Sequence, residues 1–431
     1  MHQPAFRPST AYANAAPNKI LMLALEGLVS GDFQRQWEAA KQLREVGEVA
    51  IAPLVDLTQN DTIDEDIRWF AARTLGEFDH PQALAALAQL LSDEDEELNQ
   101  IAAAALAQIG PSAIHPLSYL LQSDSTRLLA VQALAQIRQR RTIAPLLRVV
   151  NDRDSQVRQI AIEALASFQD SRILPVLVQA LDDSSAGVRK EAVTGLGLRF
   201  KWQTGKQASV VDGPDLDRDE SNRANSDGSC STGGDFSSHD LGFRLAACLH
   251  DVHLDVCAKA AAALGRWGTP YAVACLGTVL SQPRTAEALK HQLIQSLGWI
   301  PTLAAVDAIA PVLTMPEVPV RYEAIRTLST VEIPDLRERA TQYLLSHLDR
   351  QPTILEKQSI ALGLARLGCD QALNGILSCL ADDHEGVQLH AIAALKQLNT
   401  VDGYQYLQHL SQMSELTDTL RIGVQKALAE W

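Results

Sequence analysis

Small residues and leucines recur along this chain with a spacing that indicates pairs of helices. A leucine ends a small-residue segment about every 31 residues, with one longer step of 68 between Leu196 and Leu264. These anchor leucines are Leu43, Leu75, Leu106, Leu134, Leu165, Leu196, Leu264, Leu297, Leu328, Leu364, Leu395 and Leu428. A repeat of this length fits one helical hairpin of a solenoid, in which each hairpin packs on its neighbours.

Each repeat has the same order of segments. An apolar segment, often with proline near its start as in residues 143–146 (IAPL), predicts a first helix. A turn rich in Asp and Ser follows, as in residues 151–154 (NDRD), and these side chains cap helices by accepting backbone N–H bonds. The second helix carries Ala four residues before its leucine, so the two side chains share one face. Glycine then ends several of these helices, as at Gly110, Gly268 and Gly368.

The long step divides the predicted array. We expect six repeats over residues 18–200 and six over 241–431, after a disordered N-terminus at 1–17. Residues 201–240 are rich in Ser, Gly and Asp with few large apolar side chains, which predicts a disordered acidic insertion. The insertion is interpreted as a surface loop or, alternatively, as a regulatory or partner-docking segment.

Composition narrows the classes of partner. The 431 residues include 46% apolar but only 5% aromatic side chains, as suits closely packed helices. The chain has 37 Lys and Arg against 52 Asp and Glu, a formal net charge of −15. Because binding to nucleic acids and to anionic membranes depends on basic residues, we expect neither kind of partner.

The cysteines and the apolar runs suggest a location. Six cysteines occur without a CxxC pair, which is typical of reduced thiols in a cytosolic protein. Residues 1–17 have no apolar run of the kind found in secretory signals, and no stretch is long enough for a membrane span. We therefore expect a cytoplasmic protein without membrane insertion.

The repeat pattern resembles HEAT repeats, in the short form found in cyanobacterial proteins of the phycobilisome-lyase type. The resemblance rests on Asp in the turn, a basic residue seven before the leucine, Ala four before it, and a closing Leu-Gly, as in residues 66–76 (DIRWFAARTLG), 256–268 and 320–328. It covers nearly the whole chain outside the insertion. The resemblance implies an all-α, α-α superhelix (a HEAT/armadillo-like solenoid) of about twelve helical hairpins, with the second helices on its concave face.

The same resemblance implies two kinds of function. Lyase members of the family attach linear tetrapyrroles (bilins) to cysteines of phycobiliproteins. Other members act as partners, for example of an A-type iron–sulfur assembly scaffold. A fold of this kind serves both enzymes and scaffolds, so the site must decide between them.

A basic residue stands seven positions before most of the anchor leucines. These ladder residues are Arg68, Arg127, Arg158, Arg189, Lys290, Arg321, Lys357 and Arg421, and Gln36, Asn99, Cys257 and Gln388 replace them in the other repeats. One interpretation is structural, with each basic side chain bonded to an Asp of an adjacent turn. The other is a strip on the concave face that grips carboxylates of a bilin or a protein partner.

Aromatic side chains follow the ladder at Trp37, Trp69 and Tyr322, with His291 at the same position. Flat rings there could stack on a conjugated ligand or anchor a partner, and packing at the rim is the alternative. The clusters of interest are Arg68 and Trp69 with Asp66, and Arg321 and Tyr322 with Glu323.

Two patterns that could bind a metal are each incomplete. His250, His253 and Cys257 have a spacing suited to a metal, but they span a predicted turn and would not share one face. A HEAT-repeat di-iron hydroxylase needs several His-Glu pairs, and this chain has His384-Glu385 alone. We expect no metal and no bound cofactor, with a bilin as possible substrate.

The favoured function is a protein-interaction scaffold related to phycobilisome biogenesis; a bilin lyase and an iron–sulfur assembly partner are the alternatives.

Overall fold

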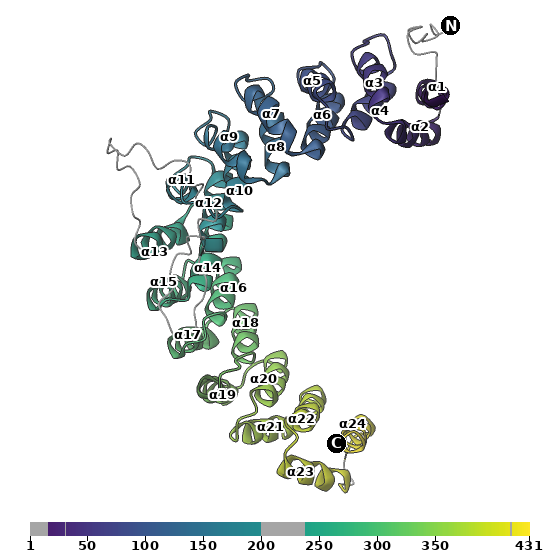
Figure 1. Cartoon of the computed structure of the whole chain (residues 1–431). Coiled ribbons are helices and arrows are strands. Elements are labelled where there is room, and N and C mark those ends of the chain that lie inside the picture. The colour runs from purple at the N-terminus through teal and green to yellow at the C-terminus, as the bar shows by residue number, and fades with distance from the viewer. Residues whose placement is uncertain (1–15, 31, 200–237, 414–415) are drawn as a thin grey trace, which may run out of the picture. The chain divides into compact units, whose positions relative to one another are not determined.

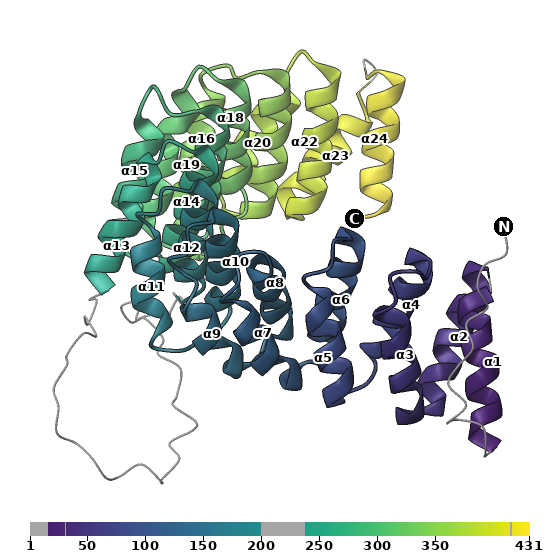
Figure 2. The ribbon, with the colours of Figure 1, turned by 90° about the horizontal axis from the view of Figure 1, so that it is seen from above.

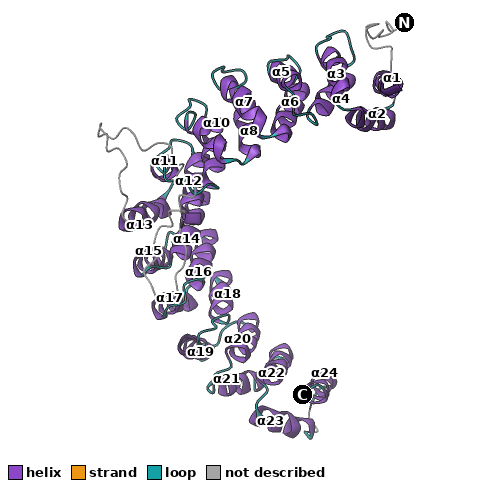
Figure 3. Ribbon diagram, viewed as in Figure 1, coloured by secondary structure: helices purple, strands orange, loops and turns teal. Residues whose placement is uncertain are grey.

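Helices account for most of the described chain. The structure is a computed structural model, and it describes residues 16–30, 32–199, 238–413 and 416–431. Those residues form 24 α-helices and no strand, which confirms the predicted all-α fold of twelve hairpins (Figure 3). The chain divides into two compact units, Met1–Gly195 and Leu196–Trp431.

The first unit contains the first six hairpins. Their first helices are α1 (Ala16–Ser30), α3 (Ile51–Thr58), α5 (Pro81–Leu90), α7 (Ile114–Leu120), α9 (Ile143–Leu147) and α11 (Ile173–Ala180). Their second helices are α2 (Phe33–Val46), α4 (Glu65–Leu75), α6 (Glu96–Ile109), α8 (Arg127–Ile137), α10 (Ser155–Ala166) and α12 (Ala186–Arg199), the last of which continues past the unit boundary.

The second unit contains the other six hairpins. Their first helices are α13 (Ser238–Ala247), α15 (Pro270–Ser281), α17 (Leu303–Ile309), α19 (Pro334–Leu348), α21 (Ala372–Leu380) and α23 (Val401–Ser411). Their second helices are α14 (Leu254–Trp267), α16 (Glu287–Gly298), α18 (Val318–Leu328), α20 (Ile354–Leu367), α22 (Glu385–Leu398) and α24 (Asp418–Ala429).

Each unit has two layers of helices. Successive second helices pack side by side, α2 on α4, α4 on α6 and α6 on α8 in the first unit, and α14 through α24 in the second. Successive first helices form the other layer, as α3, α5 and α7 do, and as α13 through α21 do (Figures 1 and 2). Side chains on the outer side of the second-helix layer are therefore presented by several repeats in a row.

The anchor leucines lie in the core between these layers. Eleven of the twelve are at most 1% exposed, and Leu428 in α24 is half-buried. The alanines four residues earlier, such as Ala71 and Ala102, are fully buried and let neighbouring helices approach closely. At Gly76 the approach is so close that a Cβ atom would lie 2.8 Å from Cβ of Ala105. Burial of each leucine contributes about 1.5–3 kcal/mol, so this spacing specifies the fold.

Several helices begin and end at the capping residues that the sequence indicates. Asp95 and Asp154 cap α6 and α10 by accepting bonds from backbone N–H groups of the first turn. Gly268 and Gly368 adopt left-handed φ values of 66° and 64°, and their N–H groups bond the carbonyls of Leu264 and Leu364. Glycine is favoured at such positions because it has no Cβ to clash.

The two arrays begin close to their predicted starts. Most of the predicted insertion at 201–240 and of the predicted N-terminus at 1–17 lies outside the described residues, and their predicted disorder stays a prediction. Helix α13 begins at Ser238 and helix α1 at Ala16, so each begins slightly before the predicted start of its array.

Candidate functional site

Most of the basic ladder is tied into the fold. In six repeats the ladder cation pairs with a carboxylate of the following repeat; the pairs are Arg68–Asp93, Arg127–Asp152, Arg158–Asp183, Lys290–Glu317, Arg321–Glu356 and Lys357–Asp382. Arg158 is bidentate, with its Nε and Nη2 atoms 2.8 and 2.7 Å from the two Asp183 oxygens. The side chains of Arg68 and Lys290 are only 8% and 4% exposed. These contacts are those of the structural interpretation, and a role of the ladder in binding stays a prediction.

Four ladder arginines, Arg127, Arg158, Arg189 and Arg321, also bond a backbone carbonyl of their own hairpin. Arg158 and Arg321 donate to the backbone carbonyls of Asp152 and Met315, each six residues earlier, at 2.8 Å. Two of the residues that replace the ladder cation keep this bond: Asn99 donates to the carbonyl of Asp93, and Cys257 to that of Asp251. In these repeats the side chain satisfies a turn carbonyl of its own hairpin, and a cation such as Arg158 or Arg321 adds a link to the next repeat.

Three of the linking carboxylates, Asp183, Glu356 and Asp382, have a pKa below the usual value, which favours their charged form. A hydrogen bond from Lys357 lowers the pKa of Asp382. Burial, the largest single influence, raises the pKa of Asp183. The hydrogen bonds from Arg158 and from the backbone N–H of Ser185, with the nearby charges of Arg158 and Arg189, together outweigh burial, and the pKa lies below its usual value. Glu356 behaves in the same way, because hydrogen bonds from Arg321 and Thr353 outweigh its complete burial and lower its pKa.

Two predicted aromatic positions meet on the first unit. The guanidinium carbon of Arg73 lies 4.4 Å from the centroid of the Trp37 ring and 5.5 Å from that of Trp69. Phe33 stacks on Trp37 at 6.4 Å and meets the buried Phe70 edge to face at 5.4 Å. We call Phe33, Trp37, Trp69 and Arg73, on α2 and α4, the aromatic face. Phe33 is 66% exposed and Arg73 is exposed, so this face is open to a partner.

The equivalent positions of the second unit form a polar network. Arg326 bonds both carboxylate oxygens of Glu323, at 3.0 and 2.6 Å, and Gln295 of α16 donates to Glu323 at 3.0 Å. Burial alone would raise the pKa of Glu323, but the bonds from Arg326 and Gln295 outweigh burial and lower it. Tyr322 is 42% exposed beside this network. We call Gln295, Tyr322, Glu323 and Arg326 the polar face.

The first unit also carries an acidic edge. Between Glu48 and Asp124 the sequence has 14 Asp and Glu residues and only two basic ones, Arg68 and Arg73. Many of the acidic side chains lie in the turns before α4, α6 and α8, where Asp61 and Asp124 are 88% and 94% exposed. Glu65, Asp66, Glu96 and Glu97 occupy the first turns of α4 and α6 and are exposed.

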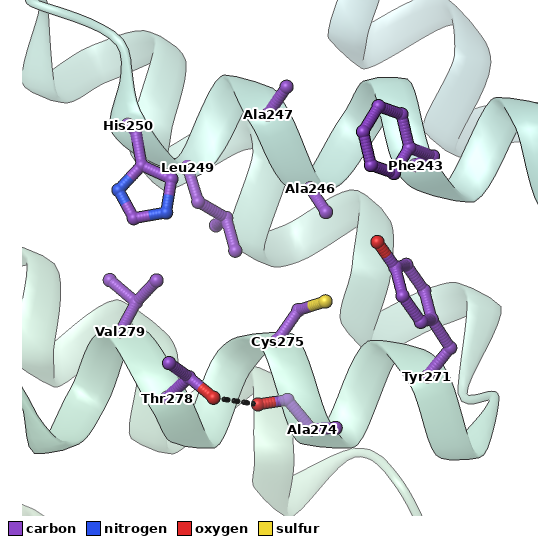
Figure 4. Close-up of a pocket in the computed structure, with 10 residues that line it drawn as sticks. All are labelled: Phe243, Ala246, Ala247, Leu249, His250, Tyr271, Ala274, Cys275, Thr278 and Val279. Carbon is purple, nitrogen blue, oxygen red and sulfur yellow. Dashed lines mark hydrogen bonds between the residues drawn. The ribbon is translucent and has the colours of Figure 1, made fainter.

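A pocket of ≈ 330 Å³ lies between α13 and α15 in the first-helix layer of the second unit. Apolar side chains from both helices line it, together with Tyr271, Cys275 and His250 (Figure 4). The thiol of Cys275 and the hydroxyl of Tyr271 point into the space between the helices (Figure 4). The sequence had indicated His250 only as part of a metal motif.

The residues of that motif do not converge. His250 ends the 3-10 helix η6 (Cys248–His250). His253 stands at the N-cap position of α14 without a side-chain capping bond, and the buried Cys257 bonds the carbonyl of Asp251. Among the residues that the structure describes, no group of three His, Cys, Asp or Glu side chains could hold a metal ion. In the same residues, no helix is long and apolar enough to cross a bilayer.

Sequence reasoning missed Arg73 and Phe33. Both lie four residues from a tryptophan that was identified, at a spacing that places side chains on one helix face. That spacing is the signal that could have found them.

Comparisons with known proteins agree with this architecture. A sequence model of HEAT repeats matches residues 51–128 and 114–197, so this part of the chain consists of HEAT repeats. The chain is similar to Kap121p in its complex with Pho4p, at 14% identity and a TM-score of 0.59, over 98% of this chain and 50% of Kap121p. Kap95p with RanGDP matches at 11% identity and a TM-score of 0.50, over 96% of this chain and 66% of Kap95p.

The matched region is thus half of Kap121p, and at such identities the likeness establishes the fold alone. The search of curated proteins gives no match.

Proposed function

We propose that this chain is a HEAT-repeat scaffold that binds another protein through the exposed side of its second helices. The observation that carries the proposal is that Trp69 and Tyr322 occupy the same position of two distant repeats and are both left partly accessible. Trp, Tyr and Arg are the residues that most often dominate binding energy at protein interfaces. The aromatic face and the polar face both supply such residues in the second-helix layer.

The resemblance of the repeats supports a phycobiliprotein subunit as the first partner to test, in the cytoplasm of a cyanobacterium. An A-type iron–sulfur assembly scaffold is the second. The cysteines that the structure describes are free thiols, in keeping with a reducing compartment.

The ladder is a poor place to test binding. Reversal of the charge of Arg68 or Arg321 would leave Asp93 or the fully buried Glu356 without its cation, so such a variant would report on folding. The exposed rings offer a cleaner test.

The experiment is affinity capture from the native cell, followed by mass spectrometry, with wild type, Trp69→Ala and Tyr322→Ala. The matched control is Tyr119→Ala, because Tyr119 is 71% exposed on α7 in the other layer of helices. We expect the same partner to be captured by wild type and by the control and to be reduced at least about tenfold by one ring variant. A partner retained equally by all four proteins would contradict the proposal.

Bilin attachment is the enzymatic alternative, and the pocket between α13 and α15 is the observation that favours it. Tyr271 and His250 there could exchange protons with a tetrapyrrole. Co-expression with a phycobiliprotein subunit and its bilin would give a covalently coloured product from a lyase. A colourless subunit that stays bound to the chain would favour the scaffold.

A further inference from the structure

Arg73 has an unexpected environment. Of the two basic residues between Glu48 and Asp124, Arg68 pairs with Asp93 and Asp61, whereas Arg73 makes no ion pair with any described residue. Arg73 instead lies over the rings of Trp37 and Trp69, although 14 carboxyl residues share its stretch of sequence. A guanidinium over an indole gains cation–π and stacking energy without giving up all of its water. The two rings therefore form a place that holds a planar cation.

Acidic side chains gather at the starts of α4 and the neighbouring α6. Glu65 and Asp66 lie one turn before Trp69 on α4, and Glu96 and Glu97 occupy the first turn of the neighbouring α6. The acidic edge continues to the largely exposed Asp61 and Asp124. A partner segment that carries several positive charges would be attracted to this surface, while an acidic segment would be repelled.

We propose that the aromatic face docks an arginine-containing basic segment of a partner protein, and that Arg73 occupies in the free chain the place that the partner's guanidinium takes in the complex. This inference rests on the proposed scaffold function and names the chemistry of the partner. Arginine is favoured over lysine, because its planar group stacks on an indole ring and a compact ammonium does not. Arg73 acts as an internal competitor, so its removal strengthens binding.

The test uses a labelled nona-arginine peptide as probe, with nona-lysine and nona-glutamate for comparison, and fluorescence anisotropy at physiological salt. We expect wild type to bind nona-arginine at least about threefold more tightly than nona-lysine and not to bind nona-glutamate. The double variant Trp37→Ala/Trp69→Ala weakens nona-arginine binding about tenfold. Arg73→Ala tightens it about threefold or more, since both rings are then free.

Removal of any positive charge would also tighten binding slightly, so the matched control is Arg35→Ala. Arg35 is exposed on α2, and its guanidinium does not lie over either indole. Equal tightening by Arg73→Ala and Arg35→Ala would overturn the proposal, as would unchanged binding by the double tryptophan variant or equal affinity for nona-arginine and nona-lysine. Circular dichroism of each variant verifies its helix content, and Trp69→Phe, which keeps a ring in place, serves if the double variant unfolds.

The result separates this inference from the scaffold function. If Trp69→Ala abolishes capture of the native partner but no variant changes nona-arginine binding, the scaffold stands and the basic partner is wrong. If nona-arginine binding depends on the rings but no partner is lost in capture, the place for a guanidinium stands and the scaffold proposal fails.

Discussion

Arg73 and Arg326 occupy the same position of their repeats, each four residues after an aromatic side chain, yet their surroundings differ. In the first unit the segment from the aromatic residue to the arginine, residues 69–73, is Trp-Phe-Ala-Ala-Arg, and Arg73 lies over two indole rings. In the second unit it is Tyr-Glu-Ala-Ile-Arg, and Arg326 is held by both oxygens of Glu323. Two neighbouring positions differ: Phe70 of the first unit is Glu323 in the second, and Trp37 of the preceding repeat is His291.

The difference shows that one position of the repeat can hold its arginine in two ways. Phe70 is 2% exposed and packs edge to face against the rings of Phe33 and Trp69. Its side chain has no charge with which Arg73 could pair. Glu323 neutralises Arg326 and joins α16 to α18 through Gln295. The aromatic face keeps an arginine that a partner can displace, whereas the polar face uses its arginine internally.

The largest expected effect comes from making the first unit like the second. Phe70→Glu removes the ring beneath Phe33 and Trp69 and buries a carboxylate beside them, and we expect a loss of about 3–5 kcal/mol in the free energy of unfolding. Urea unfolding followed by circular dichroism measures it. Phe70→Leu, which keeps the site apolar, should lose clearly less. A loss below about 1 kcal/mol for Phe70→Glu would show that Phe70 does not support the face.

The reverse change releases the arginine of the second unit. Glu323→Gln keeps the shape of the side chain but removes its charge, which weakens the bonds from Arg326 and Gln295. Because the Arg326 side chain is 51% exposed and partly screened, we expect a loss of only about 1–2 kcal/mol. Chemical denaturation near neutral pH measures it. No measurable loss would mean that the network does not stabilise the unit.

The same pair of proteins makes a prediction about pH. The pKa of Glu323 is lower in the folded chain than its usual value of 4.5, so the unfolded chain takes up the proton more readily as the pH falls. The stabilisation by ionised Glu323 is therefore complete above pH 4.5 and is lost as the pH falls through the folded pKa. The stability difference between wild type and Glu323→Gln should shrink below pH 4.5. A difference that stays constant down to pH 3 would contradict the charge as its cause.

The smallest expected effect is on the stability of the first unit when its arginine is removed. Arg73→Ala loses an exposed cation–π contact, which is worth about 0.5–1 kcal/mol. Thermal unfolding, compared with Arg35→Ala, measures the difference. A loss of several kcal/mol would mean that Arg73 is a structural side chain and not a displaceable one.

The fold could be predicted from the sequence because the residues that pack the helices together recur at a regular spacing. The anchor leucines, the alanines before them and glycines such as Gly268 each specify a contact that depends on local spacing alone. The number of hairpins and the all-helical class followed from these positions. The ladder was also identified, with the linking of cation and turn Asp as one interpretation.

The candidate site was less predictable because it depends on neighbouring helices. That Arg73 of α4 would lie over Trp37 of α2, and not against one of the many nearby carboxylates, follows from the three-dimensional placement of two rings. The bond of Asn99 and Cys257 to the turn carbonyl was equally hidden, since the sequence shows only that a cation is missing there. Periodicity shows which residue types recur, whereas these contacts are made by side chains whose types vary from repeat to repeat.

The hydrogen bond that several ladder side chains make to a carbonyl of their own hairpin has an evolutionary consequence. In the hairpin of α9 and α10, for example, Arg158 satisfies a carbonyl of its own repeat and offers its charge forward to Asp183, while Asp152 receives the charge of Arg127 from behind. A tandem duplication of that hairpin would copy both Arg158 and Asp152. The arginine of the first copy could then pair with the aspartate of the second, as Arg127 pairs with Asp152 now. Arrays built in this way can change length by whole repeats without a buried group losing its partner, and the exposed positions can then diverge independently.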